Sequence, residues 1–182
     1  IEFIEAKEMS KLFVTNSSFF KDYLASIRLK NNASLDLRNS VFNNSKTGVA
    51  LLGKASAYIH GNKFINSSGC SITCNDENNG GWNLNMEKNQ LTLGIGQMIS
   101  MTGKGEAKFT ENKFIGQNTG NDGNSAHKSG GADVALLLNN VLNCMIEKNV
   151  FKNFQRGAVE AVQSPVKIIG NNLIEMHKFP LL

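Results

Sequence analysis

The 182-residue chain has 41% hydrophobic residues, which is enough apolar surface for one domain with a buried core. Its 19 basic and 15 acidic residues give a net charge of +4 and form no concentrated run, which argues against a nucleic-acid partner. No apolar stretch approaches the roughly 18 residues of a membrane-spanning helix, and two prolines with 17 glycines are typical of a strand-and-turn protein.

Short apolar strands recur along the chain. The clearest copy has Val49 and Leu51 alternating with their neighbours, then Ala57 and Ile59, and then a third apolar piece at Phe64. Alternation is the period of a strand with one buried face, so each copy predicts three short strands. A unit this small cannot bury its inner face alone and must stack on its copies. The predicted coils are roughly 1–24, 25–47, 48–68, 69–95, 96–132, 133–156 and 157–182.

One apolar residue in the third piece marks each coil, and the markers are Phe19, Phe42, Phe64, Leu91, Phe114, Phe151 and Leu173. Two places before the markers stand Ser17, Ser40, Asn62, Asn89, Asn112, Asn149 and Asn171. Five places before them stand the apolar residues Val14, Leu37, Ile59, Met86, Phe109, Ile146 and Ile168. We expect the markers to form an internal column. Asparagine tolerates left-handed backbone and bonds nearby backbone groups, so we expect a ladder of amides at one bend.

This pattern resembles the right-handed parallel β-helix of the pectate-lyase-like superfamily, with its asparagine ladder and internal aromatic stack. The resemblance rests on motifs of the Asn62-Lys63-Phe64 type, on the repeat length and on the three-strand layout, and it covers nearly the whole chain. It implies a single all-β domain over residues 1–182, a solenoid of about seven three-strand coils. Solenoids need end caps, and none is visible, so we expect a segment of a longer protein or a subunit of an assembly, such as a homo-oligomer.

Two coils are enlarged. The first insertion, Asn75–Gly81, follows the first strand of its coil, and the second, Gly116–Gly131, precedes the first strand of the next coil. Both therefore flank the first strand, and long loops on a rigid scaffold commonly carry binding groups. In the resembled superfamily the substrate lies along this same strand face. We therefore expect an acidic or complex polysaccharide to bind there.

The outward residues near the centre of this face carry hydroxyl and amide groups suited to hydrogen bonds with sugars, namely Ser71, Thr73, Ser100, Thr102 and Asn139. Serine and threonine are also ordinary outward residues on strands, so a purely structural role is the alternative. Trp82, the only tryptophan, either forms a sugar-stacking platform beside the groove or holds the first loop by packing on the coil.

Catalysis would need ionisable groups, and these lie in or near the loops. His127 and Lys128 are candidate bases, and Arg156 and Glu160 are further catalytic candidates. Lyases of the resembled superfamily hold calcium with acidic residues, and the carboxylates that could do so are Asp76, Glu77, Asp122 and Asp133. The alternative is that all these groups are solvated loop charges. No Gly-Asp-Asp or Arg-Ile-Lys run is present, which argues against polygalacturonase-type hydrolysis.

Three cysteines do not make a disulfide framework. Cys70 and Cys74 lie four residues apart on one extended strand, which is too far for a bridge. Cys144 falls at an inward position of another strand. We expect all three to be small buried fillers, and their scarcity does not exclude a secreted protein.

Three hypotheses for function remain. The first is a carbohydrate-active domain that binds a polysaccharide and, if it is an enzyme, acts as a polysaccharide lyase or glycoside hydrolase. The second is a non-catalytic structural module of an adhesin, an autotransporter passenger or a tail fibre. The third is a protein-interaction platform formed by the long loop. We expect an extracellular or cell-surface location.

Overall fold

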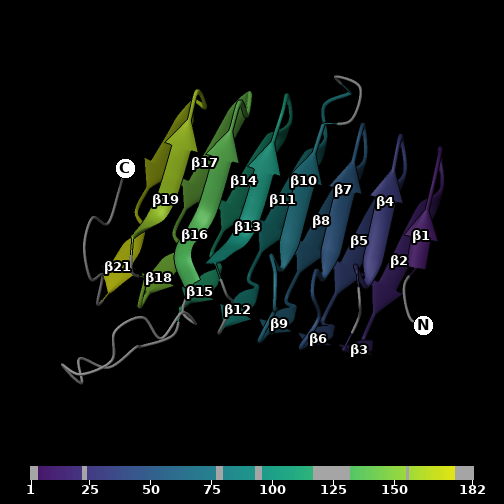
Figure 1. Cartoon of the computed structure of the whole chain (residues 1–182), viewed down its shortest axis with the longest axis horizontal. Coiled ribbons are helices and arrows are strands. Elements are labelled where there is room, and N and C mark those ends of the chain that lie inside the picture. The colour runs from purple at the N-terminus through teal and green to yellow at the C-terminus, as the bar shows by residue number, and fades with distance from the viewer. Residues whose placement is uncertain are drawn as a thin grey trace.

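The structure is a computed structural model of the chain, and it describes residues 4–21, 24–76, 80–92, 96–116, 132–154 and 156–174. The described residues form strands and turns, with no helix among them. No helix that could cross a bilayer therefore occurs in this part of the chain. Figure 1 shows the strands stacked in coils from the purple first coil to the yellow last coil.

The strands form three parallel sheets of seven strands each, and every coil gives one strand to each sheet. The first sheet contains β1 (Ile4–Ala6), β4 (Ile27–Lys30), β7 (Val49–Leu52), β10 (Ile72–Asn75), β13 (Gly96–Thr102), β16 (Ala132–Asn139) and β19 (Gly157–Val162). The second contains β2 (Lys11–Thr15), β5 (Ser34–Arg38), β8 (Ser56–His60), β11 (Asn83–Glu87), β14 (Glu106–Thr110), β17 (Asn143–Glu147) and β20 (Val166–Ile169). The third contains β3 (Ser18–Phe20), β6 (Val41–Asn43), β9 (Lys63–Ile65), β12 (Gln90–Thr92), β15 (Lys113–Ile115), β18 (Val150–Lys152) and β21 (Asn172–Ile174).

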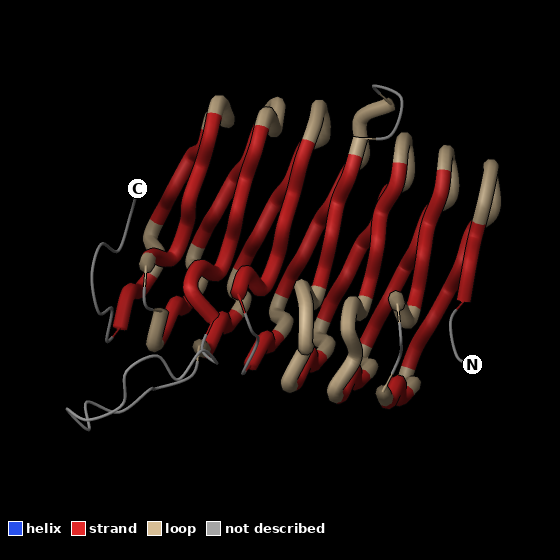
Figure 2. The backbone as a smooth tube through the Cα atoms, in the orientation of Figure 1, coloured by secondary structure: helices blue, strands red, loops and turns tan. Residues whose placement is uncertain are grey.

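The predicted parallel solenoid of seven three-strand coils is therefore confirmed. Figure 2 shows the strands of successive coils lying side by side, with turns between the strands of a coil. We call the turn between a coil's first and second strands the first corner, the turn before its third strand the second corner, and the passage to the next coil the third corner. The three sheets enclose an interior. The inward-facing side chains of their strands pack there in a single core.

The seven markers pair with one another in the register of the third sheet, which confirms the predicted column. The rings of Phe42 and Phe64 stack with centroids 4.7 Å apart, and those of Phe114 and Phe151 stack at 4.9 Å. Leu91 separates these two stacks. All four rings are fully buried, so they contribute a large share of the apolar surface removed from water.

The predicted ladder is also present, at the second corner. Each ladder residue from Ser17 to Asn149 donates its backbone N–H to the side-chain oxygen of the next coil's ladder residue. The asparagine side chains from Asn62 to Asn149 are buried. Buried backbone groups must find partners, and the ladder supplies them where the turn interrupts the sheet bonds.

The cysteines are free thiols, and two of them are buried as predicted. Burial raises the pKa of the Cys74 thiol far above its ordinary value and that of Cys144 to about 12. Cys70 is only partly buried, so the prediction that all three cysteines are buried core fillers is wrong for this residue. Cys74 and Cys144 are held as neutral thiols and are poor nucleophiles.

Candidate functional site

The outer face of the first sheet carries two rows of side chains that the strand register brings together. In the first row Thr73 of β10 lies opposite Ser100 of β13, and Leu137 and Glu160 continue the row on β16 and β19. Thr73 and Ser100 are partly buried. The register places these two predicted sugar-binding hydroxyls side by side, two coils away from Glu160.

The second row lies closer to the first corner. Asn75 of β10 pairs with Thr102 of β13, and Thr102 pairs with Asn139 of β16. All three side chains are exposed. Thr102 and Asn139 were predicted from the sequence, whereas Asn75 was assigned to the insertion and missed. The two-residue period of the strand could have identified Asn75. Because Cys74 faces inward, the next side chain faces outward.

Ser71 is a correction. It was predicted to face outward, but it is 2% exposed, and its hydroxyl lies 2.9 Å from that of Ser67. Ser71 precedes β10, where the chain enters from the third corner, and the turn containing Ser67 covers it. It cannot reach a ligand on this face.

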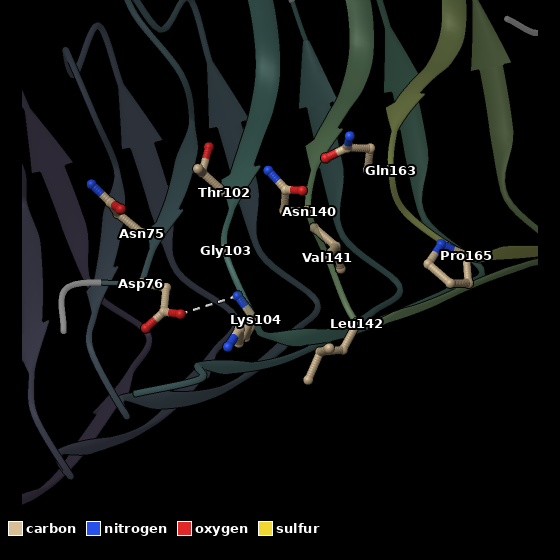
Figure 3. Close-up of a pocket in the computed structure, with 10 residues that line it drawn as sticks. All are labelled: Asn75, Asp76, Thr102, Gly103, Lys104, Asn140, Val141, Leu142, Gln163 and Pro165. Carbon is tan, nitrogen blue, oxygen red and sulfur yellow. Dashed lines mark hydrogen bonds between the residues drawn. The ribbon is translucent and has the colours of Figure 1, made fainter. Parts of the chain in front are cut away.

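A cavity of about 530 Å³ opens at the first corner, next to the second row. Figure 3 shows that it spans the turns after β10, β13, β16 and β19. Its lining residues are Asn75, Asp76, Thr102, Gly103, Lys104, Asn140, Val141, Leu142, Gln163 and Pro165. The polar groups of this first-corner cavity are amides, one hydroxyl, one ammonium and one carboxylate, over an apolar wall from Val141, Leu142 and Pro165. This donor and acceptor set suits a polyhydroxylated ligand.

The carboxylate of Asp76 binds the backbone of its own loop and of the next coil. Oδ1 accepts the N–H groups of Gly80 and Gly81, the latter at 3.1 Å, and Oδ2 accepts the N–H of Lys104 at 3.1 Å. Burial raises the pKa of Asp76, but the hydrogen bonds from Gly81, Lys104 and Gly80 outweigh it and hold the pKa below its ordinary value. Gly103 packs directly against this contact. A Cβ at position 103 would overlap the Asp76 side chain. Asp76 thus closes one side of the cavity.

Asp76 is the only one of the four predicted calcium ligands whose side chain the structure describes. Both Asp76 oxygens already accept backbone N–H groups, and the described part of the chain contains no group of three or more histidine, cysteine, aspartate or glutamate residues placed to hold a metal ion. Glu77 and Asp122 lie outside the described residues, and the Asp133 side chain is not among those described, although Asp133 belongs to β16.

Trp82 is a second correction. It is 1% exposed and packs in the core, so it cannot present a sugar-stacking platform. Its indole N–H donates to the carbonyl of Thr102 at 3.0 Å. Gly105 leaves the room for the ring, since a Cβ at this position would overlap the indole. The other prediction for Trp82 is correct: it holds the end of the first insertion against the next coil.

The structure also places two of the four catalytic candidates. Arg156 and Glu160 form an ion pair, with Nη2 and Oε2 2.6 Å apart, and both side chains are partly exposed. Glu160 is the last side chain of the first row, so the pair lies at the end of the first-sheet face. His127 and Lys128 lie outside the described residues. Among the described residues, then, this face carries a paired carboxylate but no pair of opposed carboxylates of the kind that glycosidases use.

A family model described as a right-handed beta helix region matches residues 2–142, well over half of the chain. The match covers the first five coils and all of β16. No curated protein matches the chain. The matched family describes the same architecture as the three parallel sheets, with one strand per sheet in every coil. The chain belongs to the right-handed β-helix family.

Proposed function

We propose that this β-helix domain binds a polysaccharide along the outer face of the first sheet and in the first-corner cavity. The observation that supports this proposal is the row of Asn75, Thr102 and Asn139, of which Asn75 and Thr102 also line the cavity. Amide and hydroxyl groups at regular strand spacing can donate to and accept from successive sugar hydroxyls. The proposal includes an extracellular or cell-surface location.

We propose an acidic glycan as the ligand because Lys104 lines the cavity. Lys104 supplies the ammonium of the lining, and the carboxylate of Asp76 is already engaged by three backbone N–H groups. A sugar carboxylate would meet the Lys104 ammonium and donating amides, although Lys104 also interacts with the charged Asp76 carboxylate. A neutral glycan would use the same amides and accept a hydrogen bond from Lys104, but it would lack the charge attraction.

Cleavage is a separate step, which His127 and Lys128 would catalyse as bases. The Arg156–Glu160 ion pair would contribute to cleavage only if the ligand displaced one partner from the other. A lyase reaction leaves an unsaturated sugar, which absorbs in the ultraviolet. Loss of that absorbance change in His127→Ala and Lys128→Ala, with ligand binding retained, is the expected result for an enzyme.

Binding is tested with a glycan array, followed by titration calorimetry on the glycans that bind. The double variant Thr102→Ala/Asn139→Ala should lower the affinity at least tenfold, because each lost hydrogen bond contributes about 1 kcal/mol. The matched control is Thr15→Ala/Asn32→Ala, which removes an exposed threonine and an exposed asparagine from other parts of the helix. Equal affinities for the two double variants would contradict glycan binding at the outer face of the first sheet.

A structural module of an adhesin, an autotransporter passenger or a tail fibre is the second candidate. The observation that favours it is the placement of the exposed large apolar side chains, most of which lie on the first and last coils. They include Met9, Phe13 and Phe20 at one end and Ile168, Ile169 and Leu173 at the other. This role predicts self-association and no binding to any glycan on the array.

A further inference from the structure

The second sheet carries its own hollow, of about 290 Å³, over β11, β14 and β17. Six outward side chains surround it, and they form two rows in the strand register: Asn83, Glu106 and Asn143 in one, and Asn85, Lys108 and Met145 in the other. None of the five polar members bonds to another side chain in the part of the chain that the structure describes. We call this group the second-sheet hollow.

The neighbouring part of the same sheet face is different. Tyr58 donates its hydroxyl to Glu87 at 3.1 Å, and the guanidinium of Arg38 lies 5.3 Å from the centroid of the Tyr58 ring. Arg38 in turn donates to Asp36 at 2.7 and 2.9 Å. These side chains satisfy one another across three coils, which is the ordinary arrangement of a polar strand surface. In the second-sheet hollow, by contrast, amides and charges without side-chain partners surround a depression, and such groups are suited to bind a ligand.

The second-sheet hollow adjoins the first-corner cavity through two turns. Lys104 lines the cavity and stands two residues before Glu106, and Leu142 lines the cavity directly before Asn143. The two depressions therefore lie on either side of the first corner of the same coils. A polymeric ligand that extends from the cavity across this corner would next contact the second-sheet hollow.

We propose that the second-sheet hollow is a further glycan subsite, so that a bound polysaccharide crosses the first corner from the first sheet to the second. This inference rests on the function proposed above. The amides of Asn83, Asn85 and Asn143 can each donate and accept, Glu106 accepts from sugar hydroxyls, and Lys108 donates. The ligand class is a polyhydroxylated chain that is long enough to occupy both faces.

The experiment uses galacturonic acid oligosaccharides of increasing length as probes and measures the dissociation constant by calorimetry. Asn85→Ala/Lys108→Ala should weaken the longest oligosaccharide about tenfold, as expected for two lost hydrogen bonds, and leave the disaccharide unchanged. The matched control is Asn32→Ala/Lys11→Ala, in which Lys11 lies on β2 of the same sheet, three coils away from β11 of the hollow. All these positions are exposed or partly buried, and an unchanged unfolding midpoint verifies that the variants fold.

The outcomes separate this inference from the proposed function. If the longest oligosaccharide binds the second-sheet variant as tightly as the control, while Thr102→Ala/Asn139→Ala weakens it, the subsite is refuted and first-sheet binding stands. If only the second-sheet variant weakens binding, the hollow binds glycan, but first-sheet binding and the path across the first corner are both refuted. If no oligosaccharide binds the unmodified protein, both are refuted for this ligand class.

Discussion

The side-chain oxygen of Asn112 accepts two hydrogen bonds from Asn89, one from its backbone N–H at 2.9 Å and one from Nδ2 at 3.0 Å. Asn112 donates its own Nδ2 to the carbonyl of Met86 at 3.0 Å. The same set of bonds recurs between Asn62 and Asn89 and between Asn112 and Asn149. Each amide therefore joins neighbouring coils at a corner where the sheet hydrogen bonds stop.

Asn112→Ala should lower the free energy of unfolding by about 2–4 kcal/mol, because it leaves the N–H of Asn89 and the carbonyl of Met86 buried without these partners. Denaturant unfolding at equilibrium measures the loss. Asn171→Ala is the control: Asn171 is only half-buried, so water can replace its bonds and the loss should be smaller. Equal losses at the two positions would contradict the burial argument.

Phe64→Ala should cost about 3–5 kcal/mol of unfolding free energy, since it removes a buried ring and leaves a cavity. The ring also contacts the position of Gly48, where a Cβ would lie 2.7 Å from it. Phe64→Leu should cost less than Phe64→Ala, because leucine keeps more of the buried apolar volume, and Leu91 already occupies the next position of the same column. Equal costs for the two substitutions would show that Phe64 is not packed in a closed core.

The architecture was predictable because its signal is repeated in every coil. A strand shifted by one residue would turn its buried face outward, so the alternation of buried Ala57 and Ile59 with Ser56, Tyr58 and His60 specifies the register. The marker two places after each ladder residue then aligns the coils, and Phe64 indeed pairs with Phe42 and Leu91. A strand position that is ambiguous in one coil is therefore settled by the equivalent positions of the other coils.

The site was less predictable because the turns and contacts that decide which side chains are exposed each occur in one coil only. Ser71 and Asn75 flank the inward pair Ile72 and Cys74 symmetrically in the sequence, and only the turn around Ser67 buries one of them. The partners of Asp76 are backbone N–H groups, which carry no residue-type signal. Pattern analysis therefore found the face and the insertion, but it could not tell which side chains reach solvent.

Gly105→Ala should displace the Trp82 indole, because the new methyl group would occupy the space of the ring. We expect a loss of about 1–3 kcal/mol of stability, as for other overpacked cores, together with a red shift of tryptophan fluorescence. Trp82 is the only tryptophan, so the emission reports this position alone. Lys113→Ala, an exposed change on β15, is the control and should leave the emission unchanged. An unshifted spectrum in Gly105→Ala would mean that the ring is not held against this turn.

Asp76→Asn tests the loop contact through its pH dependence. The folded protein holds the pKa of Asp76 below its ordinary value of 3.8, so the carboxylate stabilises the fold above that pH. This stabilisation is lost as the pH falls through the folded-state pKa. The difference in unfolding free energy between the unmodified protein and the variant should therefore be greatest at neutral pH and shrink below about pH 4.

The amide of the variant can still accept from Gly80 and Gly81, but if Oδ1 keeps those bonds, Nδ2 faces the N–H of Lys104, donor against donor. Asp36→Asn is the control for charge removal, because the Asp36 carboxylate bonds a side chain, Arg38, at the exposed surface. Urea unfolding from pH 7 to pH 2.5 measures both variants. A stability difference for Asp76→Asn that stays constant across this range would show that its carboxylate does not hold the loop.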